Sequence, residues 1–493
     1  MLAKVALVSQ LTLFDVTNLV VGAIIGADIY VASRFGAEYL GPFSLFVWVI
    51  AGVMAIIIAL CFAQCASLLP RVGGPYAYAK EAWGPFWGFI VGWSLWLAEW
   101  VSLAVFPVAF VQYLGVFLSL SWPVQDVVKV LFVLFLICTN VFGVKAAGRT
   151  NDVLTLVKMF PLVFFVVVAA GFVILHPANA ASNFSPLLPM GFGGFGLALV
   201  LIFWAYAGFE ISTIPAEEIK DAKKTIPRAI VLGIAIVTIF YLVTNTLLFA
   251  VMPSAQLGQS SAPLVAGTRA ALNWNANVMA VGVAIVGVGA LISVAGSDES
   301  GMIGTSRLGY ALAADGLFPT VFAKIHPRFK TPYIGIIIQA VTALMAALYG
   351  NLSILIATSV FLLSVPYVAT ALSVFWLHKK YPGQQSKWES TRIIPILGIV
   401  FSGTLLVLCG WSQILTGLIL LAAGVPIYIN YSPKHELTDL KNALISRGAI
   451  LERAYSQESR FLAHALRHLK MAYRRIRGKK QTWEAAEESH VTV

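Results

Sequence analysis

Four ionisable residues stand inside stretches of the sequence that are otherwise almost wholly apolar. They are Asp28 in GAIIGADIY, Glu99 in LWLAEWV, Lys158 in LTLVKMFPL and Glu210 in FWAYAGFE. A charge inside an apolar membrane segment is energetically costly, so such residues commonly mark a substrate path or a proton relay. A buried lysine can exchange a proton, and a carboxylate can exchange a proton or attract an amine. These residues therefore predict proton movement and the binding of a small organic amine.

Each of these residues also has a plainer interpretation, which the sequence leaves open. Lys158 lies near the start of its apolar stretch, so its amine can extend to the membrane surface. Asp28 can cap a helix, because its side chain accepts from backbone N–H groups at a helix start. Glu99 and Glu210 can be bonded to serine, tryptophan or backbone groups, or can lie near the membrane surface.

The elements that position these residues are membrane spans. Of the 493 residues, 59% are hydrophobic and only 11% are charged, whereas a soluble domain carries about 25% charged residues. Runs of about 20 apolar residues, each long enough to cross a bilayer as a helix, recur along the chain. We therefore predict an all-α membrane protein with twelve transmembrane helices at approximately 13–33, 43–66, 85–118, 126–144, 153–175, 193–213, 228–251, 277–303, 333–350, 353–377, 393–410 and 412–431.

Two of these spans are interrupted by glycine. The first contains Gly22 and Gly26, and the sixth contains Gly208. They lie five spans apart, so they run in opposite directions, which predicts a 5+5 inverted repeat with discontinuous helices 1 and 6. A broken helix leaves backbone N–H and C=O groups without partners inside the helix. Such groups are tolerated in a membrane only around a polar cavity. Helix ends there can hold a carboxylate and an amine. Alternatively, the glycines serve only close helix packing.

The distribution of positive charge predicts the topology. Of the 33 Lys and Arg residues, we assign 17 to loops on one side, 12 to the segment after residue 431 and three to the other side. The positive-inside rule then places both termini in the cytoplasm and the protein in the cell membrane. The predicted organisation is a cytoplasmic N-terminus, a first repeat, a second repeat, two extra helices and a cytoplasmic tail, at residues 1–12, 13–175, 193–377, 393–431 and 432–493.

The tail has its own pattern. Leu462, Leu466, Leu469, Tyr473 and Ile476 form one helical stripe, and basic residues crowd the same region. This predicts a basic amphipathic helix on anionic lipid of the inner leaflet. Self-association through the stripe and a merely solvated helix are the alternatives. The net charge of +11 is explained by topology and tail, so no nucleic-acid partner is expected.

Five segments resemble one family of transporters. They are GAIIGADIY at 22–30, PRVGGPYAYAKEAWGPFWGFIVGW at 70–93, NVFGVKAAGRTNDVLTLVKMFPL at 140–162, FWAYAGFEISTIPAEEIKDAKKTIPRAI at 203–230, and SRLGYALAADGLFPTVFAKIHPRFKTPY at 306–333. In this order they resemble the amino acid–polyamine–organocation (APC) superfamily of permeases over spans 1 to 10. The resemblance implies the leucine-transporter-like fold and alternating access.

The resemblance also implies site residues. It places the substrate pocket on the two breaks, with Trp204 or Tyr206 covering the substrate, at Ile25, Gly26, Ala27, Phe203, Trp204, Ala205, Tyr206 and Gly208. In sodium-independent members a lysine matching Lys158 occupies the place of the sodium ion. Asp28 departs from the family's small residue, and is expected either to attract a second amine or to cap its helix. In the polyamine–proton symporters an acidic residue stands at the position that matches Ser102. Glu99 lies one helical turn before that position.

These observations favour one function and leave two alternatives. The favoured function is a sodium-independent secondary transporter for amino acids or related organic amines, driven by proton symport or by exchange, with Lys158 and Glu210 as proton-coupling residues. A polyamine or organic-cation:proton transporter is the first alternative, with Glu99 contributing to cation specificity. A membrane sensor that signals through its tail is the second. No catalytic set, cofactor motif or metal-ligand cluster is recognised, so an enzyme, a cofactor and a metal site are not expected.

Overall fold

The computed structural model describes residues 12–69, 73–142, 148–210, 219–382 and 391–432, and every regular element in these ranges is a helix. Residues 1–431 form one compact unit and residues 432–493 a second. The amphipathic helix predicted in the tail lies outside the described residues, as does most of the predicted N-terminal segment. Both stay predictions.

Helices occupy all of the predicted spans, and most ends lie within a few residues of the predicted ones, although the helices of the first and eighth spans continue to Leu40 and Ala314, beyond the predicted ends at 33 and 303. They are α1 (Leu13–Ile24), α2 (Asp28–Leu40), α3 (Ser44–Leu68), α5 (Pro85–Leu103), α6 (Val105–Leu114), α7 (Trp122–Phe142), α8 (Gly148–Leu175), α10 (Phe195–Phe203), α11 (Ala222–Val251), α14 (Ala276–Ala314), α15 (Tyr333–Tyr349), α16 (Leu352–Lys380), α17 (Ile393–Leu408) and α18 (Trp411–Tyr431). The described residues contain eight helical segments long and apolar enough to cross a membrane, and four shorter apolar helices. The chain is thus an all-helical, multi-pass membrane protein. The count of twelve crossings and the inverted repeat stay predictions.

Four short helices stand in segments that we expected to be loops. They are α4 (Pro75–Trp83), α9 (Pro177–Ser182), α12 (Ser254–Gln259) and α13 (Pro263–Ala271). Three of them, α4, α9 and α13, begin with proline, which suits the first helical position because the N–H that it lacks has no partner within the helix. The loops between spans therefore contain more regular structure than their composition suggested.

Capping side chains define where several helices begin. Thr12 and Asp15 form a reciprocal capping box at the start of α1. Asn275 accepts from two backbone N–H groups at the start of α14, and Asn351 accepts from one at the start of α16. These bonds satisfy N–H groups that lack partners inside the helix. Asp15 therefore has a local structural role.

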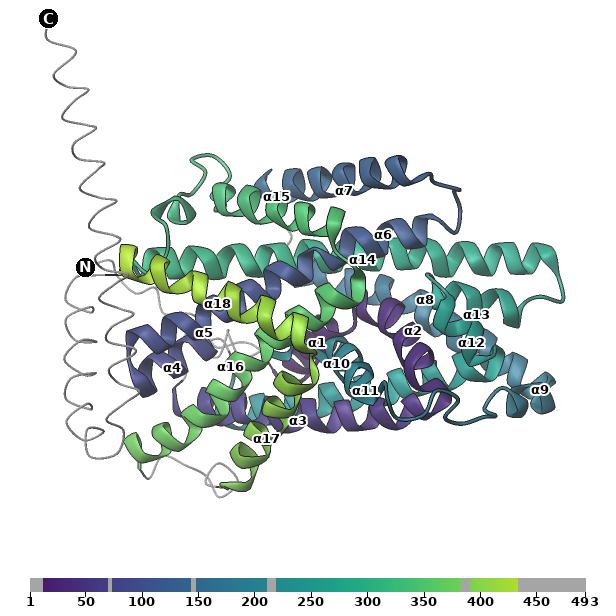
Figure 1. Cartoon of the computed structure of the whole chain (residues 1–493), viewed down its shortest axis with the longest axis horizontal. Coiled ribbons are helices and arrows are strands. Elements are labelled where there is room, and N and C mark those ends of the chain that lie inside the picture. Colours follow the sequence, from purple (N-terminus) through teal and green to yellow (C-terminus); the bar gives the residue numbers. More distant parts are fainter. Residues whose placement is uncertain (1–11, 70–72, 143–147, 211–218, 383–390, 433–493) are drawn as a thin grey trace, which may run out of the picture. The chain divides into compact units, whose positions relative to one another are not determined.

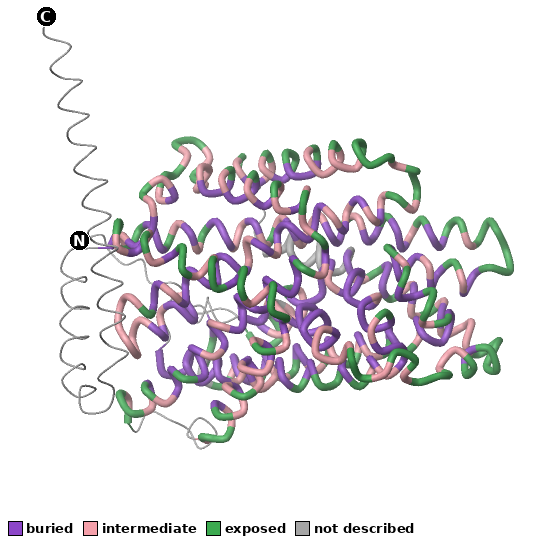
Figure 2. Tube along the Cα trace, in the orientation of Figure 1, coloured by how far each residue is buried: buried purple, intermediate pink, exposed green. Residues whose placement is uncertain are grey.

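The helices pack around a buried centre. Figure 1 shows α14, the longest helix, running across the molecule with α7 and α15 beside it. Figure 2 shows buried backbone through the centre of the bundle, and exposed positions along α7 and at the helix ends. Large apolar side chains are exposed on α7 and α18, among them Leu131, Phe135, Leu415 and Ile419. Apolar surface facing outward is what a lipid environment requires.

Candidate functional site

The first span is discontinuous at the predicted place. Helix α1 ends at Ile24, α2 begins at Asp28, and the C-cap Ile25 is extended, with φ −77° and ψ 100°. The backbone groups of this break find partners on other helices. The N–H of Ala27 donates to Ser297 Oγ at 3.2 Å, and Tyr241 Oη donates to the carbonyl of Ile24 at 3.2 Å. Side chains of α14 and α11 thus stabilise open backbone inside the bundle.

The sixth span also stops inside the bundle. Helix α10 ends at Phe203 and passes into the 3-10 turn η2 (Trp204–Tyr206). After it, Gly208 adopts φ 112°, a conformation that side-chain-bearing residues rarely adopt. This glycine lies against the first break, since a Cβ built on it would be 2.7 Å from the carbonyl oxygen of Ala23. The two breaks therefore meet, backbone to backbone.

The predicted pocket residues gather at these breaks, and all but Asp28 and Gly208, which are partly exposed, are almost completely buried. Figure 1 places α1, α2 and α10 together in the interior. Relative exposure is 2% or less for Ile25, Ala27, Phe203, Trp204, Ala205 and Tyr206. Gly26 is buried as well, and a Cβ on it would be 2.5 Å from Ser297 Oγ. A side chain at position 26 would therefore force Ser297 of α14 to shift.

The two aromatic residues of η2 face different neighbours. The indole N–H of Trp204 donates to Ser102 Oγ on α5 at 2.9 Å. The hydroxyl of Tyr206 donates to the carbonyl of Trp48 on α3 at 2.8 Å. Tyr206 also packs edge-on against the ring of Tyr241. Trp204 thus belongs to the α5 side of the break and Tyr206 to the α3 and α11 side. Their predicted role of covering a substrate stays a prediction.

Glu210 is held from several directions. The N–H of Gly208 donates to both of its carboxyl oxygens at 3.1 Å, and Tyr367 Oη of α16 donates to Oε2 at 3.2 Å. Its carboxyl group is also hydrogen-bonded to that of Glu99 on α5. Glu210 is 2% exposed, and Glu99 is partly exposed. The structure therefore brings together two acids that the sequence separates by more than a hundred residues.

Lys158 and Asp28 lie near each other beside the first break. The side chain of Lys158 is buried and interacts electrostatically with Asp28 and with Glu299 of α14. A Cβ built on Gly296 would lie 2.9 Å from Lys158 Cε and 3.4 Å from Nζ, so this glycine makes room for the end of the lysine side chain. Asp28 is the first residue of α2, whose N-cap is Ala27. Asp28 also interacts electrostatically with Glu99.

Four residues of this site were not predicted from the sequence. Ser297 and Tyr241 satisfy the first break, Tyr367 binds Glu210, and Gly296 accommodates Lys158. A serine, two tyrosines and a glycine in apolar helices carry no signal of their own, and their partners are far away in the sequence. Only the three-dimensional arrangement identifies them.

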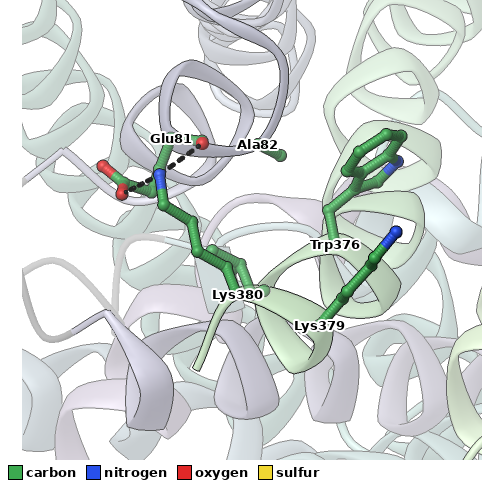
Figure 3. A pocket seen from close by; sticks show the side chains of 6 residues that line it. Glu81, Ala82, Trp376, Lys379 and Lys380 are labelled. Carbon is green, nitrogen blue, oxygen red and sulfur yellow. Dashed lines mark hydrogen bonds and ion pairs between the residues drawn. The ribbon is translucent and has the colours of Figure 1, made fainter. Parts of the chain in front are cut away.

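The short helix α4 carries a second polar cluster, away from the breaks. A surface pocket of about 370 Å³ lies between α4 and the end of α16, lined by Glu81, Ala82, Trp376, Leu377, Lys379 and Lys380. Figure 3 shows these side chains from close by. The ammonium of Lys380 pairs with Glu81 Oε1 at 2.7 Å. The residue before Glu81, Lys80, forms a second ion pair. Its Nζ lies 3.4 Å from Oδ2 of Asp315, at the end of α14. One short helix is therefore tied to the ends of two long ones.

These features define a multi-pass membrane protein with a polar, discontinuous centre, and comparison with known proteins names its class. Residues 11–427 match the family described as amino acid permease. The chain is 31% identical to the branched-chain amino acid permease BcaP of Bacillus subtilis, over 86% of this chain and 93% of that protein. It is 27% identical to the methylthioribose transporter of the same organism, over 88% and 95%. It is 29% identical to the human Asc-type amino acid transporter 1, over 86% and 82%.

The chain belongs to the amino acid permease family. This confirms the predicted membership of the APC superfamily, and it confirms that the protein belongs to a class of transporters and not of enzymes.

Proposed function

We propose that this protein is a secondary active transporter that moves amino acids across the cell membrane by alternating access. The observation that supports this most is the contact between the two helix breaks at Gly208 and Ala23. It brings the helix ends of two interrupted spans together in the interior of an amino acid permease. Two relatives, the branched-chain amino acid permease BcaP and the Asc-type amino acid transporter 1, are named for amino acids, which supports the same substrate class.

The two breaks are suited to the groups that all amino acids share. N–H groups at a helix start attract a carboxylate, and carbonyl groups at a helix end attract an ammonium group. We place the substrate's carboxylate and amine along the backbone of Ile25, Gly26 and Ala27, opposite the segment from Phe203 to Gly208. Trp204 and Tyr206 then bound the cavity on its two sides.

Lys158 supports transport without sodium. Its amine is buried near Asp28 and next to α14, and in its protonated form it supplies a positive charge beside the first break. A cation bound at this position would be repelled by the charge of Lys158. We propose that Lys158 replaces a coupling sodium ion and that protons, through Lys158 and Glu210, provide the coupling by symport or exchange. No metal or organic cofactor takes part.

The proposed topology follows the predicted repeat. Ten spans form two inverted halves, two further spans follow, and an even number of crossings leaves both termini in the cytoplasm. The basic tail then lies where anionic lipid of the inner leaflet attracts it.

A polyamine or organic-cation:proton transporter is the second candidate. It is favoured by the acidic group that surrounds the breaks, in which Glu99 contacts Glu210 and also interacts with Asp28. Three carboxyl groups of this kind suit a substrate with more than one amine.

A thermal-shift screen without sodium separates the two candidates. A ligand that binds the folded state raises the melting temperature of the purified protein. Stabilisation by neutral amino acids, followed by their pH-dependent flux in proteoliposomes without sodium, is the expected result. Stabilisation by putrescine-like or cationic compounds alone would favour the second candidate. Flux that requires sodium would contradict the role given to Lys158.

A further inference from the structure

Two carboxyl groups from different helices are in direct contact at the second break. Glu99 lies in the last turns of α5, and Glu210 follows η2. Their carboxyl groups are hydrogen-bonded to each other. Two ionised carboxylates offer only acceptors and repel each other, so this contact requires one proton between them.

The other partners of Glu210 indicate which residue carries that proton. Glu210 accepts from the N–H of Gly208 at both oxygens and from the hydroxyl of Tyr367 at Oε2. Donors that converge on a carboxyl group favour its ionised form. Glu210 is therefore the carboxylate, and Glu99 is the protonated acid that donates to it. Glu99 is also the more exposed of the two.

The charged and titratable groups around this pair come from four helices. Asp28 of α2 interacts with Glu99, and Lys158 of α8 interacts in turn with Asp28 and with Glu299 of α14. Tyr367 of α16 faces Glu210. A further acid on α14, Asp298, is buried, and its Oδ1 has no hydrogen-bond partner among the described residues.

We propose that Glu99 and Glu210 form a proton-binding site of their own, distinct from Lys158, in which Glu99 holds the proton and releases it to water. Release breaks the O–H bond of Glu99 and leaves two facing carboxylates, which repel across the contact between α5 and the second break. Proton release would therefore loosen this contact and bias Glu210 to move away from α5. The proton site itself does not rest on the proposed transport function, although its link to movement does.

Infrared difference spectroscopy tests the site directly in the purified full-length protein. Spectra recorded across a pH series should contain a carbonyl-stretch band of a protonated carboxylic acid that disappears as pH rises. We expect Glu99→Gln to remove this band. Glu210→Gln should shift it to higher frequency, because a neutral amide is a weaker acceptor than a carboxylate. Asp298→Asn is the matched control, since it removes a buried acid outside the pair and should leave the band in place.

Two outcomes would overturn the proposal. One is a spectrum in which Glu99→Gln removes no acid band, and the other is a Glu99 band that Glu210→Gln leaves unmoved. If Glu99→Gln does not fold, Glu210→Gln still tests the contact from the other side. Transport is measured separately, as amino acid flux. An intact Glu99 band without amino acid flux would contradict the proposed function alone, and flux without the band would contradict the proton site alone.

Discussion

The backbone of Gly208 lies directly against the carbonyl of Ala23, with room for no side chain between them. A Cβ on Gly208 would stand 2.7 Å from the Ala23 oxygen and 3.1 Å from its carbonyl carbon. The same glycine has φ 112° and donates its N–H to Glu210. One residue thus joins the two helix breaks and positions an acid.

Gly208→Ala should therefore destabilise the protein. The substitution meets both a close backbone contact and a conformation that disfavours any side chain, a strain of about 1–3 kcal/mol. We expect a lower melting temperature in detergent and reduced flux. Gly171→Ala is the control, because nothing lies within 4 Å of a Cβ at that position in α8. Equal melting temperatures for the two variants would show that the contact is not needed.

Lys158→Ala should abolish transport or remove its pH dependence. The substitution deletes the buried charge beside Asp28 and leaves space next to Gly296. The measurement is initial flux in proteoliposomes over a range of pH. Lys129→Ala is the matched control, since Lys129 pairs locally with Asp126 on α7 at 3.0 Å and should leave the profile unchanged. A pH-sensitive flux that survives in Lys158→Ala would remove this residue from the mechanism.

Asp28→Asn should weaken cationic substrates more than neutral ones. The change keeps the size of the side chain at the start of α2 but removes the negative charge near Glu99 and Lys158. Competition of cationic and neutral amino acids for the same flux measures the difference. Equal losses for both classes would instead indicate a structural role at the helix start.

The ion pair in Figure 3 should contribute little to stability. Lys380 and Glu81 are 2.7 Å apart, but their side chains are 53% and 20% exposed, and exposed pairs contribute about 0.2–1 kcal/mol. A double-mutant cycle with Lys380→Met and Glu81→Gln should give a coupling in this range that falls as salt increases. A coupling several times larger, or one insensitive to salt, would contradict this estimate.

Much of the fold was predictable because its signals are local. Apolar runs gave most ends of the long helices to within a few residues, although α14 continues to Ala314, well beyond the predicted end at 303, and glycines marked both breaks. The charged residues inside the spans were also conspicuous, and the structure places Asp28 and Lys158 at the first break and Glu99 and Glu210 at the second.

The pairing of these residues was not predictable, because it depends on contacts between distant helices. Nothing in LWLAEWV indicates that Glu99 faces Glu210, and the sequence comparison drew attention to Ser102 instead, which accepts from Trp204. Tyr367 and Ser297 are ordinary members of their helices until the fold brings them to the breaks. The short helix α4 was missed for another reason, since its nine residues, PYAYAKEAW, are too few to stand out as a span.

Helix α14 forms an unbroken rod from the interior to the edge of the protein. Its 39 residues extend about 58 Å, nearly twice the roughly 30 Å thickness of the hydrocarbon layer. Ser297 accepts a hydrogen bond from the backbone of the first break. Asp315 lies some 27 Å further along the helix, at 1.5 Å per residue, and forms an ion pair with Lys80 of α4. We therefore expect a displacement at the break to be carried along this rod to α4, where the Lys80 side chain, 38% exposed, offers a site for a chemical or fluorescent reporter.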